Sequence, residues 1–214
     1  MSVKLIWATT DADALVAYMA RVSNPDAQPG DPGAKLVAYL IRHKHWSPFE
    51  MANVCVEIET TRDVGRQLLR HRSFAFQEFS QRYASVDALS EAPLREARMQ
   101  HPTNRQASVA CEDVSHQVWW EAAQEYIRSE ALKRYQIALK NGIAKEVARA
   151  VLPEGLTMSR LYCNGNIRSW LHFCALRMGN GTQPETQVIA GQCWGVLRQV
   201  CPAIVEAWEA TNEL

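Results

Sequence analysis

The sequence of 214 residues predicts a single α+β domain, in which a small mixed or antiparallel sheet packs with several long helices. Two kinds of pattern support this prediction. Apolar residues recur at helical spacing over long stretches, most clearly from 108 to 140, whereas residues 52–60 alternate as in a half-buried strand. No internal repeat or low-complexity tract divides the chain, and its length suits one sizeable core. We therefore expect one domain over residues 1–214.

Composition and charge exclude several functions. The 23 basic and 23 acidic residues give no net charge, which argues against a general binder of nucleic acids or membrane surfaces. The N-terminal stretch lacks the apolar core of a secretory signal, and no run of about 18 apolar residues occurs, so we expect a cytoplasmic protein without a membrane partner. The six cysteines lie far apart and indicate reduced core thiols. His43 and His45 lack further ligands nearby, so no metal site is expected.

The first elements along the chain are two helices. Asp11 is expected to cap a helix that ends before Pro25. A turn-rich loop follows, and Asp31 is expected to open a second helix that ends near His45.

A strand and a short helix come next. Residues 52–60 place Val, Val and Ile on one face and Cys, Glu and Glu on the other. Thr60 or Thr61 should then cap a helix through Arg70, whose polar face carries Gln67 and Arg70 toward the following loop.

The middle of the chain predicts one long helix. Residues 85–107 are polar and poorly periodic, so we read them as a long excursion. A helix from Ser108 to Lys140 follows, and a second from 143 to 151 stops before Pro153. The residues expected to be buried in the long helix are Val118, Trp119, Ala122, Tyr126, Leu132, Tyr135 and Leu139.

The last third predicts a strand and two helices. Alternation from Leu156 to Tyr162 favours a strand, followed by a turn at residues 163–165. Asn166 should cap the next helix, and residues 182–185 form a capping box for the last one.

Residues 70–83, RHRSFAFQEFSQRY, combine three arginines with four aromatic side chains. One interpretation is a basic helix end that runs into an amphipathic strand with a solvated face. The alternative is an anion site, because guanidinium forks suit phosphate or a flat anionic ring, and a ligand would offset the roughly 3 to 5 kcal/mol cost of a buried unpaired arginine. The close interleaving of charge and aromatic residues favours the ligand.

Three more arginines stand beside apolar helix faces, at Arg149, Arg168 and Arg177. Each alone is typical of a surface residue whose stem lies along the apolar face. Together they fit a phosphorylated ligand and a second anionic cofactor. The chain has no GxGxxG, GxxxxGK[ST] or GxSxG motif, so dinucleotide-fold and P-loop chemistry find no support.

The spacing of these residues resembles a known signature. Arg70, His71 and Arg72, then seven residues, Ser80, one residue and Arg82 resemble the motif of flavin-dependent thymidylate synthases. Companion segments at 47–72, 149–153, 166–177 and 183–185 extend the resemblance over roughly residues 20 to 200.

The resemblance implies a fold and a reaction. The family has a small twisted sheet between helices and forms homotetramers whose active sites lie at subunit junctions. Its enzymes convert dUMP to dTMP with FAD as cofactor, methylenetetrahydrofolate as carbon donor and NADPH as reductant, and they need no protein nucleophile. The resemblance therefore implies a methyltransferase of nucleotide biosynthesis that is also a flavoprotein.

The resemblance also implies roles for individual residues. Arg70, Arg177 and Ser80 are the implied catalytic residues. The implied dUMP-binding residues are Gln67, Arg70, Glu78, Ser80, Gln81, Arg82, Arg149 and Arg177. The implied FAD-binding residues are Ser23, Arg70, His71, Arg72, Ser73, Asn166, Arg168 and His172. The chain departs from the common family pattern at Gln81, at Met51 and over residues 179–182.

Three rival functions stay open at this point. A cysteine-dependent thymidylate synthase would need a reactive thiol, which neither Cys174 on its apolar helix face nor Cys201 beside a proline provides. An RNA-binding module could use the arginines with Phe74 and Phe76 as stacking platforms. A third hypothesis is a flavin or nucleotide binder that has lost turnover.

Overall fold

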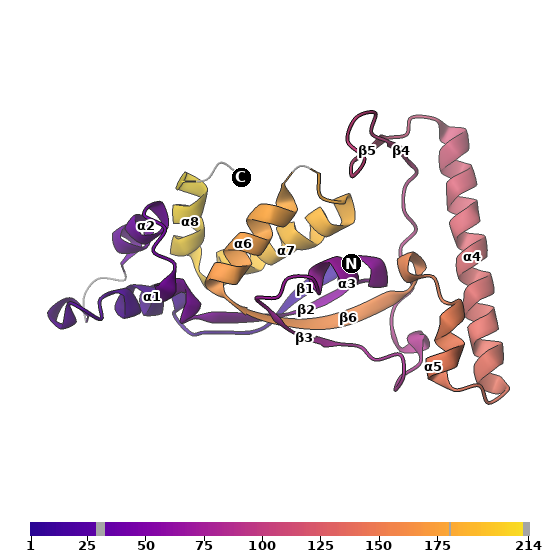
Figure 1. Ribbon diagram of the computed structural model, residues 1–214, viewed down its shortest axis with the longest axis horizontal. Coiled ribbons are helices and arrows are strands. Elements are labelled where there is room, and N and C mark those ends of the chain that lie inside the picture. Colours follow the sequence, from indigo (N-terminus) through magenta and orange to yellow (C-terminus); the bar gives the residue numbers. More distant parts are fainter. Residues whose placement is uncertain (29–32, 180, 212–214) are drawn as a thin grey trace.

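The computed structural model describes residues 1–28, 33–179 and 181–211; the helix start expected at Asp31 lies outside them. A four-stranded antiparallel sheet in the order β1-β2-β6-β3 forms its centre (Figure 1). Its strands are β1 (Ser2–Ala8), β2 (Asn53–Thr61), β6 (Met158–Asn166) and β3 (Ala75–Glu78). The expected α+β class is confirmed, and the sheet is antiparallel throughout.

Helices α6 and α7 lie over one face of the sheet, and α1, α2 and α8 pack together at its left end in Figure 1. These helices are α1 (Ala12–Ala20), α2 (Ala34–Arg42), α6 (Ile167–Met178), α7 (Pro184–Val200) and α8 (Pro202–Thr211). The alternation in β2 explains this packing, because Val54, Val56 and Ile58 are buried in the core that the helices close. Glu57 and Glu59, which have the opposite parity, are only partly buried.

The short helix α3 (Arg62–Leu68) follows β2 and lies against the middle of the sheet. The packing is close: a Cβ built at Gly65 would lie at van der Waals distance, 3.5 Å, from a methyl carbon of Leu161 on β6. The helix ends before Arg70, where the sequence predicted it to continue, so Arg70 belongs to the following turn.

Strand β6 is longer than predicted. Residues 163–165, expected as a turn, continue the strand, because β2 pairs with them on one side and β3 on the other. The local Asn-Gly turn signal is therefore overridden by backbone pairing with two distant segments. The strand then leads directly into α6.

The long helix α4 (Val114–Lys140) stands beside the sheet and helices, at the right of Figure 1. The prediction that it starts at Ser108 is wrong: Ser108–Ala110 forms β5, which pairs with β4 (Arg98–Gln100) in a second, two-stranded sheet. Helix α4 begins after Asp113, whose carboxylate accepts a hydrogen bond from the backbone N–H of Ser115 at 2.8 Å.

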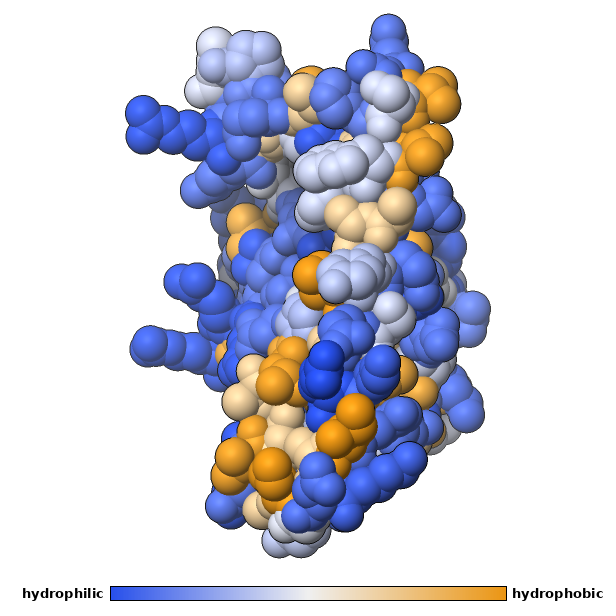
Figure 2. Space-filling model, turned by 90° about the vertical axis from the view of Figure 1, so that its right-hand side faces the viewer, coloured by the Kyte–Doolittle hydropathy of each residue, from blue (hydrophilic) through white to orange (hydrophobic). Residues whose placement is uncertain are grey.

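Much of the apolar surface of α4 is exposed. Tyr135 is buried as predicted, but Val118, Trp119 and Tyr126 are 62%, 64% and 68% exposed, and Ala122 is exposed as well. Figure 2 views this side of the molecule and shows hydrophobic residues among hydrophilic ones, gathered toward the lower end. Leu132 and Leu139 are partly buried, but the prediction for the other four was wrong, because no described part of the chain covers that face of the helix.

Several helix ends also differ from prediction. Asp11 adopts a left-handed backbone conformation with φ of 48° and makes no side-chain cap. The expected capping box at 182–185 does not form, because Gln183 precedes α7 without a side-chain cap bond. Helix α2 ends at Arg42, and the segment 143–151 splits into α5 (Lys145–Ala148) and a 3-10 turn at Arg149–Val151.

The cysteines match their predicted place in the core. Five of the six free thiols are buried, and Cys111 is half-buried. Within the described residues, no three metal-ligating side chains come together. Of the helices over 1–28, 33–179 and 181–211, none has the length and apolar character needed to cross a membrane.

Candidate active site

Two motifs that are distant in the sequence meet at the end of α3. The Nε atom of Arg177, near the C-terminus of α6, donates a hydrogen bond to Nε2 of His71 at 2.9 Å. Arg70 and Arg72 flank His71 with exposed side chains. We call these four residues the RHR cluster; it presents three guanidiniums around one imidazole.

The environment of His71 keeps its imidazole neutral. Burial and the nearby charge of Arg177 both lower the pKa of His71 below its ordinary value of 6.5. Because Nε2 accepts the hydrogen bond from Arg177, it carries no proton. His71 therefore orients the guanidinium and is not a general acid near neutral pH.

The start of α6 brings further predicted residues to this cluster. Asn166 caps the helix as expected, since its side-chain oxygen accepts a hydrogen bond from the backbone N–H of Ser169 at 2.9 Å. Ser169 also donates to the carbonyl of Ser73 at 3.5 Å, which ties the RHR loop to α6. Arg168 pairs with Glu50, and His172 lies one turn further along, exposed.

Aromatic rings pack against the RHR cluster and form the floor on which it rests. Phe173 meets the ring of His71 edge-on at 5.0 Å between centroids, and Phe74 packs on Trp170 at 4.5 Å. Phe74 fits because residue 165 is glycine: a Cβ there would lie 2.3 Å from a ring carbon of Phe74. This floor holds the loop that carries Arg72 and Ser73.

A second group of predicted residues lies beyond the other end of β3. Arg82 pairs with Glu146 at 3.7 Å, and Nε of Arg149 donates to the backbone carbonyl of Glu146 at 3.3 Å. The hydroxyl of Ser80 accepts from the backbone N–H of Arg82 at 3.4 Å. We call Ser80, Arg82 and Arg149 the basic loop cluster. Since exposed ion pairs contribute little, its arginines are available to an anion.

Gln81 sits inside this loop and departs from the common family residue. Its side chain is 4% exposed, and Nε2 has no hydrogen-bond partner among the described residues. A buried donor without an acceptor costs about 1 to 3 kcal/mol. It is therefore a candidate for a bond to a ligand.

Two other predicted residues are held within the chain. Glu78 accepts from the hydroxyl of Ser159 at 2.9 Å and pairs with Arg62 at 3.3 Å. Gln67 donates to Gln183 at 2.6 Å and accepts from Thr186 at 3.0 Å. Both side chains are thus fixed before any ligand binds.

One copy of the chain does not gather all predicted residues into one place. Between the two clusters the backbone runs through the extended strand β3, whose four residues span about 13 Å at roughly 3.3 Å per residue. The RHR cluster precedes this strand and the basic loop cluster follows it. Ser23 is exposed in the turn after α1.

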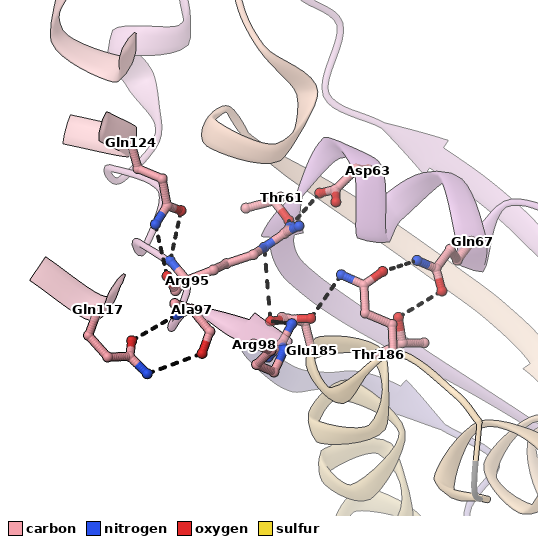
Figure 3. A network of polar contacts seen from close by, with 11 residues as sticks. Thr61, Asp63, Gln67, Arg95, Ala97, Arg98, Gln117, Gln124, Glu185 and Thr186 are labelled. Atoms are coloured by element: carbon pink, nitrogen blue, oxygen red, sulfur yellow. Dashed lines mark hydrogen bonds and ion pairs between the residues drawn. The ribbon is translucent and has the colours of Figure 1, made fainter. Parts of the chain in front are cut away.

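A buried ionic network next to Gln67 was not predicted. It joins Asp63 on α3, Arg95, Arg98 on β4, and Glu185 on α7 (Figure 3). Its partners are 32 to 90 residues apart, and two of them lie in the segment read as a polar excursion, so local patterns could not reveal it. The sequence signal for this network was Glu185, which belongs to the companion segment 183–185 of the family resemblance.

The donor set of the RHR cluster fits FAD. Arg72 and His172 are exposed, and the side chain of Arg168 is 42% exposed with a single ion pair to Glu50. Guanidiniums and imidazoles near a helix start suit a pyrophosphate. The aromatic floor below them gives the loop the rigidity that a binding site needs.

Comparisons with known proteins define the class. Residues 4–203 match the family model described as thymidylate synthase complementing protein. The chain is 44% identical to a probable flavin-dependent thymidylate synthase of Paramecium bursaria Chlorella virus 1, over 97% of this chain and 98% of the relative. It is 42% identical to a flavin-dependent thymidylate synthase of Synechocystis, over 92% and 89% of the two chains.

A solved structure gives the same result. The UMP/dUMP methylase PolB of Streptomyces cacaoi, crystallised with 5-Br dUMP, superposes with a TM-score of 0.84 at 30% identity and covers 100% of this chain and 96% of its own. The same enzyme bound with 5-Br UMP gives a TM-score of 0.85.

The fold, the two arginine clusters and these matches define a nucleotide-modifying enzyme. The chain belongs to the thymidylate synthase complementing protein family, which is the family of flavin-dependent thymidylate synthases. The resemblance inferred from the RHR motif is confirmed, and with it the expected class of FAD-dependent methyltransferase. The RNA-binding alternative has no support from any of these matches.

Proposed function

We propose that this enzyme methylates dUMP at a site built by the RHR cluster of one subunit and the basic loop cluster of another. In the overall reaction, dUMP, methylenetetrahydrofolate, NADPH and a proton give dTMP, tetrahydrofolate and NADP⁺. FAD, when bound, supplies the redox chemistry. The residues of the chain bind the rings, orient them and stabilise charge.

The observation that carries the proposal is the hydrogen bond from Arg177 to His71. It joins the two family motifs and fixes the Arg177 guanidinium at His71, the chain neighbour of the exposed Arg70. Arginines that are already oriented can stabilise negative charge as it develops on a pyrimidine, because they need no reorganisation during reaction. We assign Arg70 and Arg177 to this role, with Ser80 as the third catalytic residue.

The basic loop cluster supplies the phosphate site of dUMP in this proposal. Ser80, Arg82 and Arg149 offer a hydroxyl and two guanidiniums, and Gln81 contributes its unpartnered amide donor. Glu78 and Gln67, held by internal hydrogen bonds, complete the dUMP residues.

For FAD, we propose the remaining residues of the first cluster and its surroundings. Arg72, Arg168 and His172 have side chains accessible to an anion, while Ser73 and Asn166 fix the loop and the helix start. Arg70 serves both ligands. Ser23, exposed in the turn after α1, completes the proposed FAD residues.

Assembly into a homotetramer follows from the same argument. The two clusters lie at opposite ends of β3 in one chain, and in this proposal a second chain brings its own cluster to the same ligand. The exposed apolar residues of α4, including Val118, Trp119 and Tyr126, offer surface for such contacts. A closed symmetric assembly is the common outcome of such self-complementary surfaces.

The test is dTMP formation from dUMP with methylenetetrahydrofolate, NADPH and the FAD-loaded enzyme. We expect product only when all components are present, and flavin absorbance in the purified protein. Failure of dUMP to bind or to change flavin reoxidation would refute the proposal. UMP should be run in parallel, because PolB is a UMP/dUMP methylase; methylation of UMP at a comparable rate would show that the substrate class is wider than dUMP.

A further inference from the structure

A chain of hydrogen bonds connects Gln67 to a buried carboxylate. Glu185, 8% exposed, accepts from Nη2 of Arg98 at 2.7 Å through Oε1 and from Nε2 of Gln183 at 2.8 Å through Oε2. The side-chain oxygen of Gln183 accepts from Nε2 of Gln67 at 2.6 Å. The hydroxyl of Thr186 donates to Oε1 of Gln67 at 3.0 Å, which completes the chain (Figure 3).

This chain has only one self-consistent direction. An ionised carboxylate accepts hydrogen bonds and cannot donate, so Gln183 must turn its NH₂ group toward Glu185 and its oxygen toward Gln67. Gln67 must then turn its NH₂ group toward Gln183 and its oxygen toward Thr186. The orientation of the Gln67 amide is therefore set by a charge two side chains away.

The charge at the head of the chain is itself held in place. Burial opposes ionisation of Glu185, but the hydrogen bonds from Arg98 and Gln183 outweigh it and lower the pKa below its usual value. Arg95 lies 4.0 Å away and also binds Asp63 at 2.7 Å. The backbone of Arg95 is in turn fixed by the side chain of Gln124 on α4.

We infer that Glu185 is a positioning residue: acting through Gln183, it fixes where the Gln67 amide offers its N–H donor and where it offers its oxygen acceptor to dUMP. This inference rests on the proposed role of Gln67 in binding dUMP. After the internal bonds are made, Gln67 has one N–H and one oxygen lone pair left for a ligand. If the amide turns over, donor and acceptor change places.

The variant Glu185→Gln tests this directly because it keeps the shape and reverses the chain. A guanidinium cannot accept a hydrogen bond, so the new amide must keep its oxygen toward Arg98 and turn its NH₂ group toward Gln183. The side-chain amide of Gln183 then turns over, and that of Gln67 follows, so that each exchanges the positions of its oxygen and NH₂ group. The hydroxyl of Thr186 rotates to accept a hydrogen bond from Gln67. We expect the Kd for dUMP to rise about tenfold, which corresponds to roughly 1.4 kcal/mol, with FAD content and NADPH-driven flavin reduction unchanged.

The double variant Gln183→Glu with Glu185→Gln should rescue binding. A carboxylate at 183 accepts from the new amide on one side and from Gln67 on the other, so Gln67 returns to its native orientation. We expect the Kd for dUMP to return to within about threefold of wild type. A purely structural role of Glu185 predicts no rescue, because the charge has still left position 185.

Controls separate the outcomes. Glu206→Gln removes one exposed negative charge on α8 and should leave the Kd for dUMP unchanged. Unchanged binding in Glu185→Gln, or equal weakening in the single and double variants, would overturn the inference while dTMP formation by wild type still upholds the proposed reaction. If Gln67→Ala binds dUMP as wild type does, the proposed role of Gln67 fails and the inference fails with it.

Discussion

At the scale of single residues, the pairing of His71 with Arg177 decides how the RHR cluster works. The imidazole accepts from Nε of the guanidinium, which leaves the terminal nitrogens of Arg177 free for other partners. Phe173 packs against the imidazole edge-on, so the ring cannot turn freely. A neutral histidine is thus a structural part of an arginine site.

A dependence of stability on pH follows from His71. Its pKa is lowered in the folded protein, so between that value and 6.5 the unfolded chain binds the proton and the native protein does not. In this window the free energy of unfolding increases as the pH rises and decreases as the pH falls. We expect wild type to lose more stability than His71→Asn when denaturant titrations at pH 7.5 and 5.5 are compared.

The matching control for that measurement is His45→Asn, which removes an exposed histidine. It should keep the pH response of wild type. A wild-type response equal to that of His71→Asn would show that the pKa of His71 is not lowered.

Cysteine chemistry can also be tested at the residue scale. Cys174 is fully buried, and burial raises the pKa of its thiol well above the ordinary value, so a thiolate does not form near neutral pH. Its sulfur lies 3.7 Å from the carbonyl of Ala190, inside the packing of α6 on α7. We expect Cys174→Ser to form dTMP within a few fold of wild type; complete loss of turnover in a normally folded variant would revive a covalent mechanism.

At the scale of elements, the end of β6 sets the position of the RHR loop. Gly165 lets Phe74 lie directly on the strand, and Asn166 then starts α6. We expect Gly165→Ala to destabilise the fold by about 1 to 3 kcal/mol, because the added methyl would lie 2.3 Å from the Phe74 ring. FAD retention should fall as well, since the loop before Phe74 carries Arg72.

Helix α7 offers the matched control. Gly191 has nothing within 4 Å of an added Cβ, so Gly191→Ala should be neutral or stabilise by about 0.5 to 1 kcal/mol. Thermal melting and flavin absorbance of both variants measure the difference. Equal stability of the two alanine variants would contradict the packing of Phe74 on β6.

The elements also show what local patterns can predict. Asn166 and the inward face of α6 were predicted because a cap and a helical period involve neighbours in sequence. Strand β1, the continuation of β6 through residues 163–165, and the β4-β5 pair were missed, because they depend on pairing with distant segments. The network around Glu185 was missed for the same reason.

The residues of the site were easier to name than to place. The RHR motif identified His71 and the companion segment 166–177 identified Arg177, and the structure joins them. An amphipathic strand after the helix end was one interpretation of residues 70–83, but its pairing with β6, which separates Arg72 from Arg82, depends on a segment about 85 residues away and could not be predicted from motif spacing. The exposed face of α4 was misjudged because helical periodicity shows an apolar face without showing what covers it.

At the scale of the whole molecule, the shared site makes a quantitative prediction. Arg82→Ala and Arg177→Ala should each lose activity, because each removes one of the two clusters from every site. When the two inactive variants are assembled together from equal amounts, about a quarter of the sites should draw intact clusters from different chains and recover activity. Co-expression followed by a dTMP assay measures this recovery.

The control is Arg177→Ala assembled with a second variant of the same cluster, Arg70→Ala. Both lesions lie on the same side of the site, so no mixed site is intact and activity should stay at the level of the single variants. Absence of recovery in the first mixture, with mixed assemblies demonstrated by mass, would mean that one chain supplies both clusters.

The two outer strands of the sheet limit how copies of this protein can associate. Strand β1 shifts register between Leu5 and Trp7 and carries Lys4 on its edge, and β3 is only four residues long. Bulges, charges and short length all prevent another strand from pairing with an edge. Both edges therefore disfavour association in which the sheet extends from one copy to the next. This protects an enzyme with abundant exposed apolar surface from fibrous aggregation. The helix faces and sheet faces remain as the surfaces for assembly.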